Sequence, residues 1–190
     1  MNLGILYGLN LEEVNCSNNK ITNIVMDSVG ELVKFDCSNN DLMTLDVSQC
    51  LKLEELNCSG NQLMELDVGH QTQLTQLDCS NNKLTELNVK QNGSLTSLIC
   101  NDNQLTTLDL SHNHSLSKLN CAKNRLACLD VTGISGGTIT ANGNRRPIAV
   151  RTDGKFDLTT LSGFNVGKAT NWNGGSVSGT ILTVEDGKDE

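Results

Sequence analysis

The residues of this chain that could do chemistry are above all its eight cysteines, six of which recur every 21 residues. Zinc sites use close pairs such as C-x₂-C in a tetrahedron, which an evenly spaced row of thiols does not offer. Disulfides between strands about 4.8 Å apart are within reach, but side chains in register on parallel strands all point the same way. We therefore interpret these thiols as small buried hydrophobic groups, inert because they are buried. The six are Cys16, Cys37, Cys58, Cys79, Cys100 and Cys121.

The other two cysteines, Cys50 and Cys128, fall outside this series. Both occupy repeat positions that are otherwise mostly polar, so we expect both thiols to be more exposed than the other six. They are four repeats apart, which is on the order of 19 Å at strand spacing and too far for a disulfide within one chain. They are either reactive groups, able to form intermolecular links, or neutral variation.

A column of acidic residues could bind a cation. Neighbouring carboxylates about 5 Å apart could share a calcium ion. Aspartates beside turns can equally accept hydrogen bonds from the backbone, and no calcium-loop motif is present. We therefore predict no metal site. The column consists of Asp46, Asp67, Asn88, Asp109 and Asp130.

Catalysis finds little support in the sequence. His70, His112 and His114 fall in variable segments, and none has a fixed nucleophile or carboxylate partner. The chain contains no G-x-S-x-G, no H-E-x-x-H and no glycine loop that could cradle a phosphate. We expect a protein that is not an enzyme and needs no cofactor.

The composition narrows the choice of partner. With 14 basic and 22 acidic residues the formal net charge is −8, which disfavours nucleic acid and anionic membranes. Aromatic residues make up 3% of the chain, so base-stacking platforms are not expected. No apolar run approaches the roughly 20 residues that a membrane helix needs. The segment after Met1 has neither a basic start nor a cleavage pattern, so no signal peptide is visible.

The six regular cysteines belong to a longer repeat that must position them. Each unit reads L-x-x-L-x-C-x-x-N-x-L-x-x-L-x-V, with small changes from one unit to the next. No unit can bury its apolar residues alone, so units of this kind stack into a solenoid. The recurring asparagines are Asn19, Asn40, Asn61, Asn82, Asn103 and Asn124.

The alternation within one unit predicts its local structure. Leu56-Asn57-Cys58 reads apolar, polar, apolar, which is typical of a strand with one buried face. Stacking then produces a parallel sheet, and the asparagine after each strand can satisfy backbone groups at the bend. Twenty-one residues leave no room for a real helix, so we expect extended or 3₁₀ segments on the return side. The second run, as in Leu66-Asp67-Val68, could form a second, shorter sheet.

The unit resembles the leucine-rich repeat, with cysteine where leucine usually ends the strand. The 21-residue form is most similar to the repeats of the bacterial internalin J type and related surface proteins, over about Leu3 to Val131. The resemblance implies a β-rich solenoid: a right-handed superhelix with a parallel β-sheet, few or no α-helices and a C-terminal β-rich cap. It also implies a cell-surface or secreted protein that binds a protein or glycan through the sheet face.

We expect three regions along the chain. Residues 1–131 form the solenoid, a half repeat followed by six full ones; residues 132–184 form a degenerate last coil and a β-rich cap; residues 185–190 are a disordered acidic tail. Leu3 to Leu11 aligns with Leu45 to Leu53, so the chain starts halfway through a repeat. This start suggests a fragment of a longer protein or an unusual reading frame.

The C-terminal region is less regular. Ile139 to Asn144 resembles a seventh strand and turn, one residue short, with Ala141 in the cysteine position. Ser178-Gly179 is a plausible tight turn before the alternating run Thr180 to Val184. We expect aromatic residues in this region to cover the open end of the leucine core; they are Phe156, Phe164 and Trp172.

The outward positions of the predicted sheet are the candidate ligand face. The middle column alternates amides and carboxylates, which keeps the carboxylates two coils apart and limits repulsion between adjacent strands. Sheet stability alone explains that order, and the face has no aromatic anchor of the kind common at interfaces. The face is therefore either a binding surface or simply solvated. Its candidate residues are Lys34, Asp36, Asn57, Gln76, Asp78, Ile99, Lys118 and Asn120.

Our leading hypothesis is a non-enzymatic interaction module of a bacterial surface or secreted protein, acting in adhesion. Two alternatives stay open. The repeats could be a rigid spacer within a larger surface protein, or the chain could be an intracellular repeat scaffold. Eight apparently unpaired cysteines fit a reducing compartment better than an oxidising one, which favours the cytoplasmic alternative.

Overall fold

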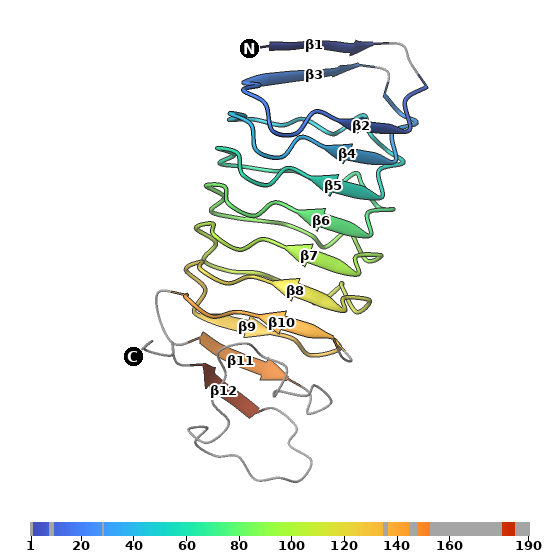
Figure 1. The fold of residues 1–190 in the computed structure, drawn as a ribbon. Coiled ribbons are helices and arrows are strands. Elements are labelled where there is room, and N and C mark those ends of the chain that lie inside the picture. Colours follow the sequence, from blue (N-terminus) through green and yellow to red (C-terminus); the bar gives the residue numbers. More distant parts are fainter. Residues whose placement is uncertain are drawn as a thin grey trace.

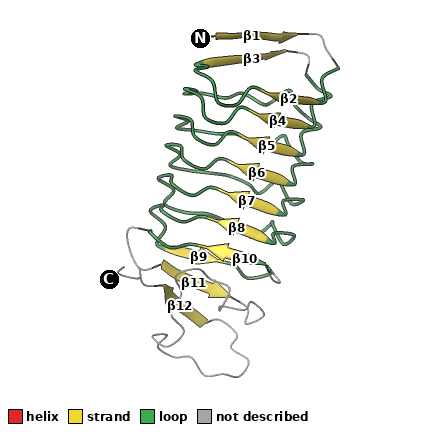
Figure 2. Cartoon of the chain, in the orientation of Figure 1, coloured by secondary structure: helices red, strands yellow, loops and turns green. Residues whose placement is uncertain are grey.

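The computed structural model describes residues 2–7, 10–27, 29–134, 137–144, 148–152 and 180–184. Over these residues the chain is a stack of coils made of short strands and loops, without a helix (Figures 1 and 2). The expected β-solenoid is confirmed. Each coil contributes one short strand to a sheet on one side and then returns along the other.

The main sheet has seven parallel strands in the order β10-β8-β7-β6-β5-β4-β2. Each strand is three residues long, and only its middle residue faces the core. In register, Leu56 lies beside Leu77, and Leu77 beside Leu98. The strands are β2 (Glu13–Asn15), β4 (Lys34–Asp36), β5 (Glu55–Asn57), β6 (Gln76–Asp78), β7 (Ser97–Ile99), β8 (Lys118–Asn120) and β10 (Thr138–Thr140).

The strands are short because the chain bends directly after each cysteine. Two residues past the cysteine, or past Ala141 in the last coil, each coil places one residue at positive φ, between 52° and 69°. Glycine adopts this conformation freely and asparagine or aspartate tolerates it, which explains the residue types that fill most of the column. The residues are Asn18, Asn39, Gly60, Asn81, Asp102, Lys123 and Gly143.

The core is one continuous stack of apolar side chains between the main sheet and the return runs. Each coil adds leucines at the same positions, and those of the middle coils, such as Leu53, Leu63 and Leu74, have no exposed surface. At the first coil the packing is looser, since Leu11 and Val14 are only partly buried. A side chain in the middle of the stack therefore packs against neighbours above and below, as in other solenoids.

In the part of the chain that the structure describes, the expected second sheet on the return side forms at the two ends of the stack. At the N-terminal end, β3 (Asn23–Asp27) pairs with β1 (Asn2–Tyr7). At the other end, β9 (Cys128–Asp130) pairs with β11 (Ile148–Thr152), which pairs antiparallel with β12 (Thr180–Val184).

Between these ends the described residues hold a single isolated bridge, Asp67 to Asn88. In these coils the aspartate or asparagine accepts a hydrogen bond from the N–H two residues on; Asp130, at the end of β9, accepts the same bond, so this bond alone does not exclude a strand. Val25 occupies the same position in β3 and cannot make that bond, and there the strand is five residues long.

The N-terminal half repeat differs from its predicted register by one residue. Leu3 pairs with Ile24, as the alignment of Leu3 to Leu11 predicts, but Leu6 rather than Ile5 lies opposite Met26. A bulge between Leu3 and Leu6 accounts for the shift, because a bulge inserts one extra residue into one strand.

At the C-terminal end, β10 pairs with β8 so that Ile139 lies beside Leu119. Ala141 and Asn144 are buried there, in line with the cysteine and asparagine of the earlier coils. β12 coincides with the alternating run Thr180 to Val184. The expectations for Phe156, Phe164, Trp172, the Ser178-Gly179 turn and the 185–190 tail lie outside the described residues.

Candidate functional site

The cysteine ladder, formed by the six regular cysteines, lies inside the stack. Five of its thiols are fully buried and Cys16, at the open first coil, is partly buried. None of the eight cysteines forms a disulfide. Burial raises the pKa of Cys58 and Cys100 well above the ordinary thiol value, and that of Cys121 to about 12. Thiols that stay protonated at neutral pH are poor nucleophiles and poor metal ligands.

Of the two other cysteines, Cys128 is exposed as expected, but the prediction for Cys50 is wrong. Cys50 has no exposed surface, and its Sγ lies 3.5 Å from Sδ of Met26. Burial raises the pKa of Cys50 to about 11. Polar residues at this repeat position do not indicate exposure, because Gln71, Asn92 and Asn113 are also fully buried.

The asparagine ladder, formed by the recurring asparagines, ties each coil to the one before it. Nδ2 of Asn82 donates to the carbonyl oxygens of Cys58 (3.0 Å), Cys79 (3.1 Å) and Ser80 (3.1 Å). Its Oδ1 accepts a hydrogen bond from the backbone N–H of Leu63 at 2.9 Å. Both ends of the amide are used, and the bonds to Cys58 and Leu63 cross to the previous coil.

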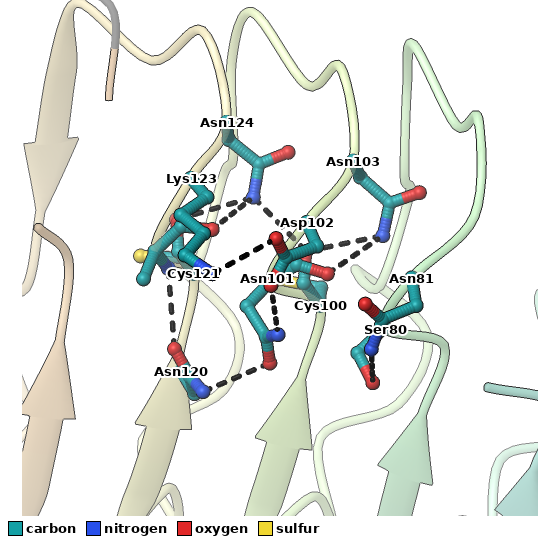
Figure 3. Close-up of polar contacts among 11 residues, drawn as sticks. Ser80, Asn81, Cys100, Asn101, Asp102, Asn103, Asn120, Cys121, Lys123 and Asn124 are labelled. Carbon is teal, nitrogen blue, oxygen red and sulfur yellow. Dashed lines mark hydrogen bonds and ion pairs between the residues drawn. The ribbon is translucent and has the colours of Figure 1, made fainter. Parts of the chain in front are cut away.

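The same pattern recurs through the stack. Asn103 and Asn124 repeat it in the coils drawn in Figure 3. Asn144 continues it in the shortened last coil, where its Oδ1 accepts from the Leu126 N–H at 3.0 Å. Asn19 begins the ladder and donates only within its own coil, to Cys16 and Ser17.

A second column of buried side chains lies on the return side, and its mixed polar and apolar residue types do not predict it from the sequence. This return column contains three amides in successive coils whose side-chain nitrogens bond the previous coil. Nδ2 of Asn92, for example, donates to the carbonyls of Val68 (2.9 Å) and Gln71 (2.8 Å). The side-chain oxygens of all three amides are buried without a hydrogen-bond partner. The column consists of Val29, Cys50, Gln71, Asn92, Asn113 and Ile134.

The outward face of the main sheet forms a shallow groove of about 370 Å³. Seven of the eight predicted ligand-face residues line it. The eighth, Asn120 at the end of β8, pairs with Ile99 of β7. Its Nδ2 donates a hydrogen bond to Oδ1 of Asn101 at 2.8 Å. The seven are Lys34, Asp36, Asn57, Gln76, Asp78, Ile99 and Lys118.

Several polar groups of this groove are held in place by neighbours. Nζ of Lys34 lies 2.8 Å from Oε1 of Glu55, and this bond raises the pKa of Lys34. Oδ1 of Asp78 accepts from the Ser80 N–H at 3.0 Å and from the Ser80 hydroxyl at 2.7 Å. Lys118 takes part in no ion pair with any described residue.

At the ends of β7 and β8 a polar network joins two coils (Figure 3). Nδ2 of Asn101 donates to Oδ2 of Asp102 at 2.7 Å, and Nζ of Lys123 lies 3.3 Å from the other oxygen of that carboxylate. Together with the bond from Asn120, this network gives the groove a fixed polar border at that end. A signal for it is present in the sequence, since Asn101-Asp102 replaces the Ser-Asn or Ser-Gly of the earlier coils.

The residues of the acidic column stabilise the turns that follow them. Oδ1 of each member accepts a hydrogen bond from the N–H two residues on, as Asp46 does from Ser48 at 2.9 Å. Hydrogen bonds from Ser111, and after them the ammonium of Lys90, lower the pKa of Asp109. Among the described residues no group of three or more His, Cys, Asp or Glu side chains is placed to hold a metal ion.

The three histidines are exposed at separate turns, and Nδ1 of His112 lies 3.0 Å from the Ser111 hydroxyl. No helix long and apolar enough to cross a membrane occurs in the part of the chain that the structure describes. What the main-sheet groove offers chemically is hydrogen bonds, carboxylates, one free ammonium and the partly exposed Ile99.

Comparison with known proteins relates this chain to the leucine-rich-repeat family. A model of the Leucine Rich Repeat family matches residues 10–32. The solved functional domain of InlJ from Listeria monocytogenes, which includes a cysteine ladder, is 39% identical with a TM-score of 0.56; the match covers 71% of this chain and 35% of that one. The chain therefore spans about a third of the length of that InlJ structure. No curated protein matches the chain.

Two further solved structures show the same fold at lower identity. The leucine-rich repeat domain of APL1B is 24% identical with a TM-score of 0.69, over 80% of this chain and 49% of that one. A leucine-rich-repeat protein of Leptospira interrogans is 22% identical with a TM-score of 0.62, over 80% of this chain and 45% of that one.

Proposed function

This chain belongs to the bacterial leucine-rich-repeat proteins of the internalin-like, cysteine-ladder type, and from that premise we propose that it is a non-enzymatic interaction module. It binds a protein ligand through the groove on the outward face of the main sheet and acts in adhesion. The observation that carries this proposal is the groove itself, which gathers seven side chains from five adjacent strands.

The groove suits binding because it is organised before a ligand arrives. The Lys34–Glu55 ion pair and the serine hydrogen bonds of Asp78 fix side chains that would otherwise lose rotamer freedom on binding. The backbone beneath them is held by the asparagine ladder. Ile99 supplies apolar contact and Lys118 an unpaired charge, so a ligand with an apolar residue beside a carboxylate fits this surface.

We also propose a cell-surface or secreted location, which the resemblance to bacterial surface proteins supports. Free cysteines favour a cytoplasmic location, because exposed thiols oxidise outside the cell. Six of the eight thiols are buried, however, and burial raises their pKa, so oxidants reach them poorly. Fractionation of the producing bacterium tests the location; a chain found only in the cytosol contradicts it.

The binding proposal is tested by screening the chain against an array of purified extracellular domains of host-cell proteins, with a glycan array beside it. For any binder, the Ile99→Asp, Lys118→Glu double variant should weaken binding at least 10-fold. The matched control, Thr106→Asp, Arg125→Glu, carries the same charge changes at exposed residues outside the groove. Equal loss in both variants, or loss in neither, contradicts the proposed surface.

A further inference from the structure

The return side carries a second and larger hollow, formed by the outward residues of the return runs. It encloses about 720 Å³, roughly twice the volume of the main-sheet groove. Four successive return runs line it, beginning with Asn23 and ending with Asn88. We call it the return hollow.

Among the described residues, one strongly exposed methionine lines the return hollow and a second lies one coil away, outside the lining. Met64, which lines it, is 63% exposed, and Met43, one coil earlier at the same repeat position, is 58% exposed. In the next two coils this position holds Thr85 and Thr106. Two adjacent methionines in water are unfavourable for the free protein and give the folded core nothing, because neither is buried.

The return hollow is also uniformly acidic. Its lining contains four carboxylates and no lysine or arginine, whereas the main-sheet groove contains Lys34 and Lys118. None of the four takes part in an ion pair with any residue that the structure describes. The four are Asp46, Glu65, Asp67 and Glu86.

The order of these charges differs from that on the main sheet. There, Asp36 and Asp78 are separated by Asn57 in the intervening coil. On the return side, Glu65 and Glu86 occupy the same repeat position in adjacent coils, and so do Asp46 and Asp67. Like charges on neighbouring rungs repel each other. Asp46 and Asp67 each accept one turn hydrogen bond through Oδ1, and the return hollow still gathers four carboxylates that a cationic ligand would neutralise.

We propose that the return hollow docks an extended, cationic and apolar segment of a partner protein. Lysine or arginine side chains of the segment face the four carboxylates, and its apolar side chains pack on Met43 and Met64, whose flexible thioethers adapt to different shapes. A metal ion alone would leave the methionines exposed. A second copy of this chain, with its net charge of −8, would be repelled. This surface is separate from the main-sheet groove, so the proposal stands independently of the adhesion ligand.

The test uses the full chain labelled with ¹³C at the methionine methyl groups. The probe is the peptide acetyl-Gly-Lys-Leu-Lys-Leu-Lys-Gly-amide, and a matched peptide with glutamate for lysine is its control. We expect the Met43 and Met64 signals to shift with the lysine peptide and not with the glutamate peptide. Met26, which is partly buried in the core, serves as an internal reference and should not shift.

Two variants locate the binding. Glu65→Gln with Glu86→Gln should weaken binding of the lysine peptide about 3- to 10-fold at physiological salt, since each exposed ion pair contributes modestly. Met64→Thr, which installs the residue of the following coils, should weaken it about as much. The matched control is Glu12→Gln with Glu54→Gln, two exposed carboxylates that line neither hollow, and it should leave binding unchanged.

Several results would overturn the proposal. Equal loss in the control variant would mean that the peptide responds to the general acidity of the chain. Equal shifts with the glutamate peptide, or none with the lysine peptide, would remove the charge argument. Shifts of Met43 and Met64 on concentrating the protein alone would make a second copy the occupant.

Discussion

The strand side and the return side of each coil both bury amide side chains, yet they use them differently. On the strand side Asn82 donates to three carbonyls and accepts from the N–H of Leu63. On the return side Asn92 donates to two carbonyls, and its Oδ1 is buried without a partner. An unsatisfied buried acceptor costs about 1–3 kcal/mol, so only the strand-side amide is fully compensated.

The residue types at the two positions agree with this difference. Every full coil carries asparagine on the strand side, because the bend leaves a backbone N–H and several carbonyls facing inward. The return column accepts Val29, Cys50 and Ile134 as well as amides. The strand-side position therefore requires an asparagine to close the turn, whereas the return column requires only a side chain that fills the space.

The largest effect that we predict is a loss in the free energy of unfolding when the pH is raised. Most of this loss comes from the thiols of the cysteine ladder, on the strand side. A buried thiol keeps its proton above pH 9.0, where the unfolded chain releases it, so stability is present below that pH and falls above it. Above pH 9.0 each buried thiol lowers the free energy of unfolding by about 1.4 kcal/mol per pH unit. This loss continues up to the pKa of the folded state, which is about 11 for Cys50 and about 12 for Cys121. Five buried ladder thiols and one return-column thiol act together.

Urea unfolding at pH 8, 9, 10 and 11 measures this loss. Cys50→Val, which removes the return-column thiol, should reduce the slope only by the share of one thiol. A free energy of unfolding that is constant up to pH 11 would mean that the thiols are not buried.

The next effect is that of the strand-side amide. Asn82→Ala removes four hydrogen bonds and leaves the buried N–H of Leu63 without its acceptor. We expect a loss of about 3 kcal/mol in the free energy of unfolding, measured with urea at neutral pH. A loss below about 1 kcal/mol would show that water or neighbouring groups replace the ladder.

The return-side amide should matter much less. Asn92→Val removes an orphaned oxygen, and the carbonyls of Val68 and Gln71 each keep a backbone hydrogen bond, from Gln71 and Leu74 respectively. We expect the same urea measurement to give a value within about 1 kcal/mol of the parent. A loss equal to that of Asn82→Ala would erase the distinction between the two sides.

The smallest effect concerns the exposed thiol of the return side. A thiol reagent applied to the native protein should modify Cys128 quickly, Cys16 slowly and the remaining cysteines only after denaturation. Modification of Cys128 alone should not change the unfolding midpoint. Rapid labelling of all eight cysteines in the native protein would contradict the burial of the ladder.

Much of the strand side could be predicted from the sequence. Its apolar residues, cysteines and asparagines recur at fixed intervals, so period and residue type together determine which side chains face inward. The burial of Cys50 could not be predicted in this way, because its column mixes Val29 with Gln71, and a polar residue type indicates exposure rather than burial. A buried amide held by backbone carbonyls is a tertiary feature that hydropathy does not report.

Two other differences arise from the backbone. The extra residue between Leu3 and Leu6 changes the register of β1 without a break in the apolar pattern. The alternation of Leu66-Asp67-Val68 predicts a return-side strand, but the described residues form only the isolated bridge Asp67 to Asn88 there. For the ligand face, the positions could be listed from the sequence, but the ion pair of Lys34 and the unpaired state of Lys118 required the structure.

Hydrogen exchange tests the central claim, that the strand-side amides close the stack, most directly. The N–H groups of Leu42, Leu63, Leu84 and Leu105 donate to the ladder oxygens. We predict that these four amides exchange only through global unfolding, so that their protection free energies match the free energy of unfolding from urea. Exchange of these amides at the rate of the exposed turns would contradict the account.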